Sequence, residues 1–344
     1  MTKIKVLLVD DSGFMRLVVS DMINSSNDLM VVDTAENGLE AVQKTKALSP
    51  DVVLLDMTMK DYDGLYAVRN IMKDTPTPIV ILSSLGNTQP DLVFEALDCG
   101  AYDFVNKPTG VLGSKIRDLE QHLFGKLRNA AKVDIVNLKQ KGSKSNNLQH
   151  TFDTSLYDIL AIGSSTGGTG ALEHILTHMP ENLPIPVVIA QHMPQEFIHS
   201  FAERLNGILP FSVCVAREGD TLQPNIVYLM PCDVNMGVAK KRDRVVFQVF
   251  GNDFKEYNHP SVDCMMQSVA KAYGAKSISV LLTGMGSDGA LGMKDIFDQK
   301  GYTIAQDQAS CVVFGMPKAA IETGGVKSIL ALKQMPSFLV SMLS

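Results

Sequence analysis

The sequence lacks three features that would each assign the chain to a different class of protein. No apolar run approaches the roughly 20 residues that a membrane-spanning helix needs, and the short run after the basic N-terminus ends in two aspartates, unlike a signal peptide. Positive charge is not in excess, because the formal net charge is −6. No CxxC pair indicates a metal or redox site. We therefore expect a cytoplasmic protein with reduced thiols that neither inserts into membranes nor coats nucleic acid.

The length and the composition predict two domains joined by a linker. The 344 residues are too many for one ordinary core, and 45% hydrophobic with 20% charged residues is usual for a soluble globular protein. The stretch KQKGSKSNNLQHTFDTS is polar, with glycine, serine and asparagine and almost no apolar content. We predict one domain over residues 1–127, a linker over 128–156 and a second domain over 157–344.

In the first segment, short apolar runs alternate with stretches of helical periodicity. The runs IKVLLVD, MVVDTA, DVVLLD, TPIVILSS and AYDFVNKP are typical of buried strands. Strict alternation predicts a parallel five-stranded sheet with helices on both faces. The expected helices are Gly13–Ile23, Gly38–Leu48, Gly64–Met72, Asp91–Cys99 and one from near Gly113 to Leu127.

Chemically active residues follow the predicted strands of this segment, at the sheet edge where such folds bind ligands. Three carboxylates at one edge repel each other unless a cation joins them, and hard oxygen ligands suit Mg²⁺. A lysine and a hydroxyl beside them would accommodate a phosphoryl group on one carboxylate. A single strand-end aspartate is as readily a turn or helix cap, but the combination favours a site. The residues are Asp10 and Asp11 after the first strand, Asp56 after the third, Ser83 and Ser84 after the fourth and Lys107 after the fifth.

This segment resembles the response-regulator receiver domain over essentially its whole length. The resemblance implies a flavodoxin-like fold in which Asp56 is phosphorylated. It further implies an Mg²⁺ ion bound by Asp10, Asp11 and Asp56, together with the backbone carbonyl of Thr58. The phosphodonor would be a chemotaxis histidine kinase.

The same resemblance assigns switch roles to three further residues. Ser83 would be the switch hydroxyl, Lys107 the cation that senses the phosphate and Phe104 the aromatic side chain that reorients. The chain departs from the family at Lys60, where receivers often have proline. We expect this loop to be more mobile or to contact a partner.

In the second segment, three apolar strands each run into a residue with catalytic chemistry. YDILAIGSS leads into the glycine-rich STGGTGALEHIL, PIPVVIAQH ends at His192, and SISVLLTGMGSDG ends in a turn with Asp288. Strands followed by helices predict a second doubly wound, mainly parallel α/β domain whose strand ends face one side. PNIVYLMPCD and RVVFQVF predict a small β hairpin or meander beside the main sheet.

Serine, histidine and aspartate together have the chemistry of a nucleophile, its base and the carboxylate that orients the base. Gly163–Gly167 is a literal GxSxG, which favours Ser165 over the neighbouring Ser164 as the nucleophile. The glycine-rich loop has a competing interpretation as a phosphate cradle, although it is neither GxGxxG nor followed by GK[ST]. The order Ser, His, Asp differs from that of α/β hydrolases, so only geometry identifies the site.

Other histidines and the methionine pair receive a structural interpretation. His174, His178 and His199 lie on predicted helices without matching partners. Met265 and Met266 are expected to fill a core rather than form a recognition surface.

The second segment resembles the catalytic domain of the chemotaxis receptor methylesterases, the protein-glutamate methylesterases. The matching stretches are IGSSTGGTGAL, QHMPQEFIHSFAERLN, PSVDCMMQSVA, LLTGMGSDGALGM and IAQDQASCVVFGMPKAA. The resemblance implies Ser165 as nucleophile, His192 as general base and Asp288 as the orienting acid. It places Thr166 beside the nucleophile, and the backbone at Met285 in the oxyanion site.

Taken over the full chain, the resemblance implies a phosphorylation-activated serine hydrolase. Its expected reaction is hydrolysis of glutamate methyl esters on methyl-accepting chemoreceptors, which releases methanol and serves chemotactic adaptation, with receptor glutamine deamidation as a related activity. No cofactor is expected in the catalytic domain. Ser164 stands where the family commonly has alanine, which adds a hydroxyl near the reacting centre.

Two other classes stay open. A receiver joined to a non-catalytic binding domain would result if the triad does not assemble. A transcriptional regulator is the other class, although no helix-turn-helix pattern is evident in the sequence.

Overall fold

The computed structural model describes residues 3–83, 90–107, 114–133, 135, 156–251 and 259–343. The chain forms two compact units, Met1–Gln140 and Lys141–Ser344, and each is described by itself. Within the described residues, no helix combines the length and the apolar character needed to cross a membrane. The predicted domain and linker bounds stay predictions.

The first unit is a parallel five-stranded sheet in the order β2-β1-β3-β4-β5, as the alternation of strands and helices predicts. Every residue of β3 and β4 is buried, which explains their uninterrupted apolar sequences. The strands are β1 (Ile4–Val9), β2 (Leu29–Ala35), β3 (Val52–Asp56), β4 (Ile79–Ser83) and β5 (Asp103–Asn106).

Three helices of this unit begin where the sequence offers a side-chain cap. Ser12, Asn37 and Asp63 each accept a hydrogen bond from the backbone N–H three residues further on, and so satisfy a free donor of the first turn. The last helix extends three residues beyond its predicted end at Leu127 because Ala130 is still fully buried. The helices are α1 (Gly13–Asn24), α2 (Gly38–Leu48), α3 (Gly64–Asp74), α4 (Pro90–Asp98) and α5 (Ser114–Ala130).

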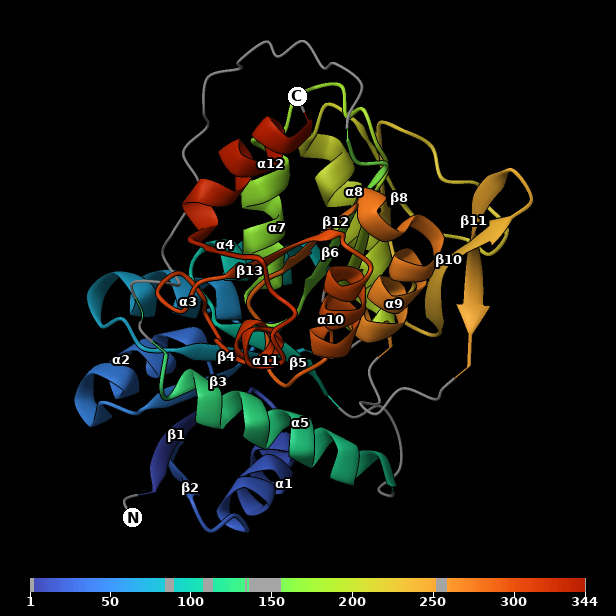
Figure 1. The fold of residues 1–344 in the computed structure, drawn as a ribbon. Coiled ribbons are helices and arrows are strands. Elements are labelled where there is room, and N and C mark those ends of the chain that lie inside the picture. Colours follow the sequence, from blue (N-terminus) through green and yellow to red (C-terminus); the bar gives the residue numbers. More distant parts are fainter. Residues whose placement is uncertain are drawn as a thin grey trace. The chain divides into compact units, whose positions relative to one another are not determined.

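The second unit has a seven-stranded sheet (Figure 1) in the order β14-β13-β12-β6-β7-β9-β8, and its strands pair in parallel. The order reverses at β6, so later strands add on both of its sides and create a switch point there. The strands are β6 (Ile159–Ser164), β7 (Val187–Gln191), β8 (Ser212–Val215), β9 (Ile226–Leu229), β12 (Ser277–Leu281), β13 (Tyr302–Gln306) and β14 (Ser328–Leu330).

The prediction for the middle of this unit is half wrong. PNIVYL was expected in a hairpin or meander beside the main sheet, but its strand β9 lies within the sheet between β7 and β8. RVVFQVF does form a hairpin strand, β11 (Arg244–Phe250), and its partner is β10 (Asn235–Lys241). Short apolar runs do not identify their partners, because pairing depends on contacts that are distant in sequence.

Two helical layers cover the main sheet. Helices α9, α10 and α11 share a buried core with the hairpin and with residues of β6, β7 and β12. Right-handed crossovers on the two sides of β6 place α7 and α8 on the opposite face, where α12 contacts α7. The helices are α7 (Gly168–Leu176), α8 (Gln195–Ile208), α9 (Val262–Tyr273), α10 (Ala290–Asp298), α11 (Met316–Glu322) and α12 (Met335–Leu343), with single 3-10 turns at Gly274–Lys276 and Leu332–Gln334.

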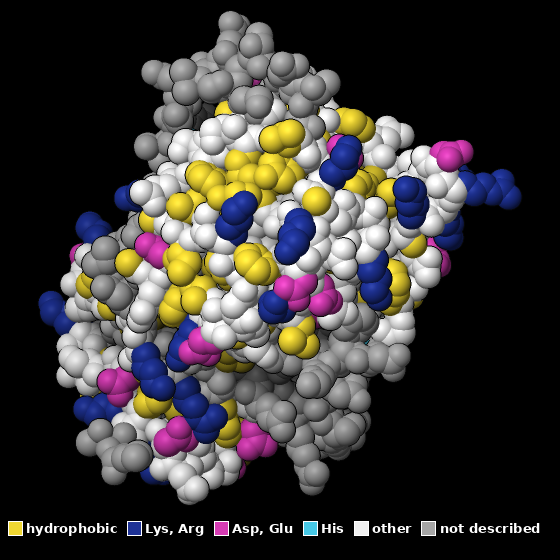
Figure 2. Space-filling view, in the orientation of Figure 1, with side chains coloured by type: hydrophobic (Ala, Val, Ile, Leu, Met, Phe, Trp, Pro, Cys, Tyr) yellow, Lys and Arg dark blue, Asp and Glu magenta, His cyan; other side chains and the backbone are white. Residues whose placement is uncertain are grey.

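The hairpin ends in a basic turn away from this core. Residues 240–244, KKRDR, are all exposed. Figure 2 shows lysine and arginine side chains projecting at the upper right, where Figure 1 places the hairpin.

Candidate functional site

The strand β6 brings the three predicted catalytic residues to one edge of the sheet. On one side, Ser164 pairs in register with Gln191 of β7, so Ser165 and His192 are the next residues of two adjacent strands. The backbone N–H of His192 donates to the carbonyl of Ser164 at 3.0 Å. On the other side, β6 pairs with β12, which leads into the turn that contains Asp288.

Ser165 lies in a tight turn between β6 and α7. Gly167 has a φ of +76°, which a side chain would strain, and the N–H of Gly168 donates to the carbonyl of Ser165 at 2.7 Å. The N–H of Ser165 donates to the carbonyl of Thr283 at 3.0 Å. Ser165 is half-buried in this turn, so the GxSxG pattern corresponds to a strand-to-helix turn, as predicted.

His192 and Asp288 form a close pair. His192 Nε2 lies 2.8 Å from Asp288 Oδ2, and the Asp288 residue is 2% exposed. Burial opposes ionisation of Asp288, but the hydrogen bond and the charge of His192, with backbone N–H donors, lower its pKa below the ordinary value. Because Nε2 is engaged by Asp288, Nδ1 is the imidazole nitrogen left to exchange a proton with a substrate or nucleophile.

The carboxylate of Asp288 is held by three further donors. Oδ2 also accepts from the N–H of Val262 at 2.7 Å, and Oδ1 accepts from the N–H of Asp263 at 2.8 Å and from Ser261 Oγ at 3.1 Å. These donors belong to the N-terminal turn of α9, so the helix fixes the orientation of the aspartate. The stretch PSVDC matched only as part of the family resemblance, and its pattern did not predict this role.

Gln191 is a second residue that sequence reasoning missed. Its side-chain amide donates to the carbonyls of Ser165 (3.0 Å) and His192 (2.8 Å), and it is 3% exposed. Ser164 is fully buried, and its hydroxyl donates to Gln191 Oε1 at 2.6 Å. The extra hydroxyl of Ser164 therefore supports Gln191. The only signal in the sequence was a polar residue within an apolar strand.

The remaining predicted residues of this site lie next to the turn that contains Ser165. Thr166 is buried, and its carbonyl accepts from Thr283 Oγ1 at 2.9 Å. Met285 is half-buried, one residue after Gly284, which bonds to Val313 and Met316 through backbone groups.

The histidines and methionines given a structural interpretation lie apart from this chemistry. His174 and His178 stack on each other within α7 and just after it, and His199 is exposed. Met265 and Met266 are fully buried in the core, as predicted.

The first unit gathers its predicted acidic residues at one point. Asp10, Asp11 and Asp56 each offer a carboxylate oxygen, and these oxygens lie within 4.8 Å of one another. Lys107 Nζ lies 2.6 Å from Asp10 Oδ2 and 2.8 Å from Asp56 Oδ2. Burial raises the pKa of Asp56, with the ion pair to Lys107 opposing the shift. The pKa of Lys107 is raised because its bonds to the two carboxylates outweigh burial.

The other receiver residues surround this acidic cluster. The N–H of Thr58 donates to Asp56 Oδ1 at 3.3 Å. Ser83 is fully buried, and its hydroxyl finds no partner among the described residues. Phe104 is also buried, with Lys126 Nζ 5.6 Å from its ring centre. Lys60 is exposed, and the mobility or partner contact of its loop stays a prediction. Ser84 lies outside the described residues.

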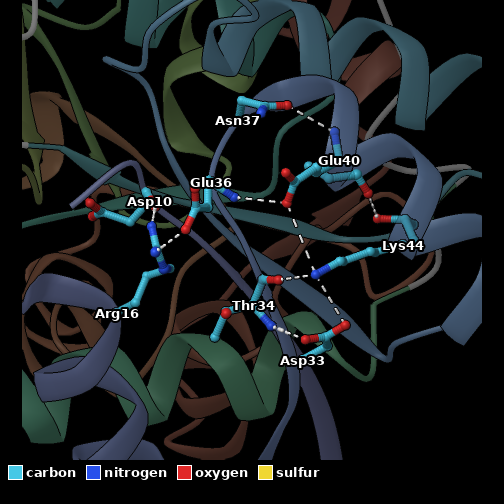
Figure 3. A network of polar contacts seen from close by, with 10 residues as sticks. Asp10, Arg16, Asp33, Thr34, Glu36, Asn37, Glu40 and Lys44 are labelled. Carbon is cyan, nitrogen blue, oxygen red and sulfur yellow. Dashed lines mark hydrogen bonds and ion pairs between the residues drawn. The ribbon is translucent and has the colours of Figure 1, made fainter. Parts of the chain in front are cut away.

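A polar network braces the acidic cluster from the side of β2 (Figure 3). Arg16 of α1 donates to the carbonyl of Asp10 at 2.7 Å and pairs with Glu36. Asn37 caps α2 at the N–H of Glu40. Through Arg16, the loop after β2 is therefore connected to Asp10 of the acidic cluster. The figure also shows Lys44 bonded to Thr34 and paired with Asp33.

Known proteins match both units. The family described as CheB methylesterase matches residues 160–339, and the response regulator receiver domain matches residues 6–116. Three relatives are named protein-glutamate methylesterase/protein-glutamine glutaminase. The one from Thermotoga maritima is 39% identical, with 98% of each chain covered; that from Archaeoglobus fulgidus is 42% identical, with 94% of each covered; and that from Salmonella typhimurium is 38% identical, covering 100% of this chain and 98% of the relative.

A solved structure agrees with the second unit. The Thermotoga maritima CheB methylesterase catalytic domain aligns with a TM-score of 0.52 and 38% identity, covering 54% of this chain and 98% of that one. Matches over both units and nearly the full length of the relatives leave one conclusion. The chain belongs to the CheB methylesterase family and has a response regulator receiver domain ahead of its methylesterase domain.

Proposed function

We propose that this protein hydrolyses methyl esters of glutamate side chains on chemoreceptors, with Ser165 as the nucleophile. The observation that supports this most is the His192–Asp288 pair, 2.8 Å apart, at the end of the strand adjacent to the one that ends at Ser165. A buried, ionised carboxylate stabilises the imidazolium that forms when His192 accepts a proton. The relatives' shared name supplies the substrate class.

The reaction follows from these positions. Ser165 Oγ attacks the ester carbonyl while its proton passes to His192 Nδ1, the nitrogen that Asp288 leaves available. Backbone N–H groups at Thr166 and Met285 are the proposed donors to the oxyanion. Collapse of the tetrahedral intermediate breaks the carbon–methoxy bond, and the imidazolium protonates the leaving methoxide to give methanol.

The second half of the reaction regenerates the enzyme. Water attacks the acyl-enzyme and gives a proton to His192. His192 then protonates Ser165 Oγ as its bond to the acyl carbon breaks and the glutamate side chain is released. Ammonia replaces methanol as the leaving group when the substrate is glutamine, so deamidation of receptor glutamines requires no additional residue.

The receiver unit is proposed to regulate this activity. The oxygen donors of Asp10, Asp11 and Asp56, with the carbonyl of Thr58, suit Mg²⁺, which would offset negative charge when Asp56 is phosphorylated. The Ser83 hydroxyl, which has no partner among the described residues, and the cation of Lys107 are the protein's own partners for a phosphoryl group. The proposed phosphodonor is a chemotaxis histidine kinase in the cytoplasm, and phosphorylation is proposed to raise esterase activity.

Methanol release from methylated receptor tests both halves of this proposal. Full-length protein is assayed with and without a small phosphodonor and Mg²⁺, next to an Asp56→Asn variant. Release that rises with phosphodonor in the wild type but not in the variant is expected. Folded protein that releases no methanol under any condition would contradict the esterase assignment and favour a binding module or a hydrolase of other bonds.

A further inference from the structure

Asp263 lies on the first turn of α9, but its side chain caps the next helix of the site, α10. Its Oδ1 accepts from the N–H of Gly292 at 2.7 Å, and further backbone bonds join it to Gly289 and Leu291. Gly289, the N-cap residue just before α10, has no side chain to provide a cap. Asp263 therefore satisfies the free N–H groups of α10 from a neighbouring helix.

The capping is reciprocal. Asp288, one residue before Gly289, accepts from the N–H groups of Val262 and Asp263 at the start of α9. Each aspartate thus lies at the beginning of one helix and binds the N-terminus of the other, where the helix dipole favours a negative charge.

The two helices approach each other closely at Gly292. A Cβ at Gly292 would lie 2.5 Å from the Cβ of Met266 and 3.2 Å from the carbonyl oxygen of Asp263. Because the contact is this close, a change at Asp263 is transmitted to the first turn of α10 and to the Asp288 that precedes it.

We propose that Asp263 is a positioning residue of the esterase: by capping α10 it holds the turn that aims the Asp288 carboxylate at His192. This inference rests on the proposed function, since it assigns Asp288 its role toward His192. Asp263 itself contacts no reacting group; it acts through the position of Asp288.

The ionised form of Asp263 is disfavoured in the folded state. Burial raises its pKa to about 6, and the charge of Asp288 adds to the shift. For an acid, a raised pKa means that the ionised form is less compatible with the folded state, so Asp263 weakens the fold as the pH rises above the unfolded value of 3.8 and does so fully above about pH 6. The titratable groups that face it are Asp288 and the thiol of Cys264.

The test compares Asp263→Asn with Asp295→Asn in the full-length protein. Asp295 is an exposed residue of α10, so its change removes the same charge without touching the cap. At about pH 8, Asp263→Asn is expected to lower kcat for methanol release about tenfold with little change in KM, and its melting temperature should equal or exceed that of the wild type. The control variant should keep the wild-type kcat.

A measurement without substrate tests the positioning role of Asp263 separately from the proposed esterase function. The proton between His192 Nε2 and Asp288 should give a downfield ¹H NMR signal, which Asp263→Asn is expected to shift or broaden. An unchanged kcat and signal would overturn the inference, as would a fall in kcat accompanied by a lower melting temperature, which indicates a structural role. Wild-type protein without esterase activity would refute the proposed function, and the NMR comparison would still test Asp263.

Discussion

Ser164 and Ser165 are adjacent in the chain and have different chemical surroundings. The Ser164 hydroxyl is buried and bonded to Gln191, whereas Ser165 is half-buried in the turn that faces the catalytic edge. The two serines could not be separated by residue type, because both lie in the glycine-rich stretch. The difference arises because successive side chains point to opposite sides at the end of a strand.

Replacing each serine by alanine should distinguish the nucleophile from its support. Ser165→Ala is expected to remove at least about 10³-fold of the esterase rate, since the members of a triad act as a unit. Ser164→Ala should cost about 1 kcal/mol of unfolding free energy, because Gln191 Oε1 loses a buried donor, and should lower the rate only a few-fold. Methanol release and thermal unfolding measure both effects. The reverse order of rates would mean that the nucleophile is misassigned.

Asp288 should make the stability of the second unit depend on pH. Its pKa is lowered in the folded state, so its contribution is present above the unfolded value of 3.8 and disappears as the pH falls through the lower folded value. Asp288→Asn is therefore expected to cost about 2 kcal/mol at neutral pH. The deficit relative to the wild type should shrink below about pH 4 in denaturant titrations. A deficit independent of pH would show that the charge of Asp288 does not stabilise the fold.

At the scale of elements, the turn between β6 and α7 depends on glycines for close packing. A Cβ on Gly168 would lie 2.2 Å from Gln191 Oε1 and 2.7 Å from the Cβ of Ser164. A Cβ on Gly170, two residues further along the same helix, would meet no atom within 4 Å. The two glycines therefore form a matched pair for testing whether the packing of this turn matters to catalysis.

Gly168→Ala should displace Gln191 and impair the site, whereas Gly170→Ala should not. We expect the first change to cost about 1–3 kcal/mol of stability through overpacking and to lower kcat. The second should raise stability by up to about 1 kcal/mol, because alanine is the better helix former. Equal activity of the two variants would contradict the role given to the Gln191 contacts.

At the scale of the whole molecule, we propose that the unphosphorylated receiver inhibits the esterase, which can be measured with the second unit alone. The fragment 141–344 contains every described element of the catalytic sheet. It is expected to release methanol faster than the unphosphorylated full chain. A phosphodonor should not change its rate, because Asp56, the proposed phosphorylation site, is absent. Equal rates for the fragment and the unphosphorylated chain would refute the inhibitory part of the regulation.

Local sequence patterns were sufficient to predict the features that depend on neighbouring residues. Alternating apolar runs and helical stretches predicted both α/β units, since the buried residues of strands and helices recur at a regular spacing in the sequence. Ser165, His192, Asp288 and the receiver's Asp56 were predicted as site residues because parallel strands collect their C-terminal residues at one edge.

The features that depend on contacts between distant segments became visible only in the folded chain. The tertiary structure placed β9 inside the main sheet, identified Nε2 as the nitrogen of His192 that meets Asp288, and turned the Ser164 hydroxyl toward Gln191. It also placed the carboxylate of Asp263, which lies on α9, at the N-terminus of α10. A buried polar side chain takes whichever partner the packed fold brings within hydrogen-bonding distance, and no local pattern specifies that partner.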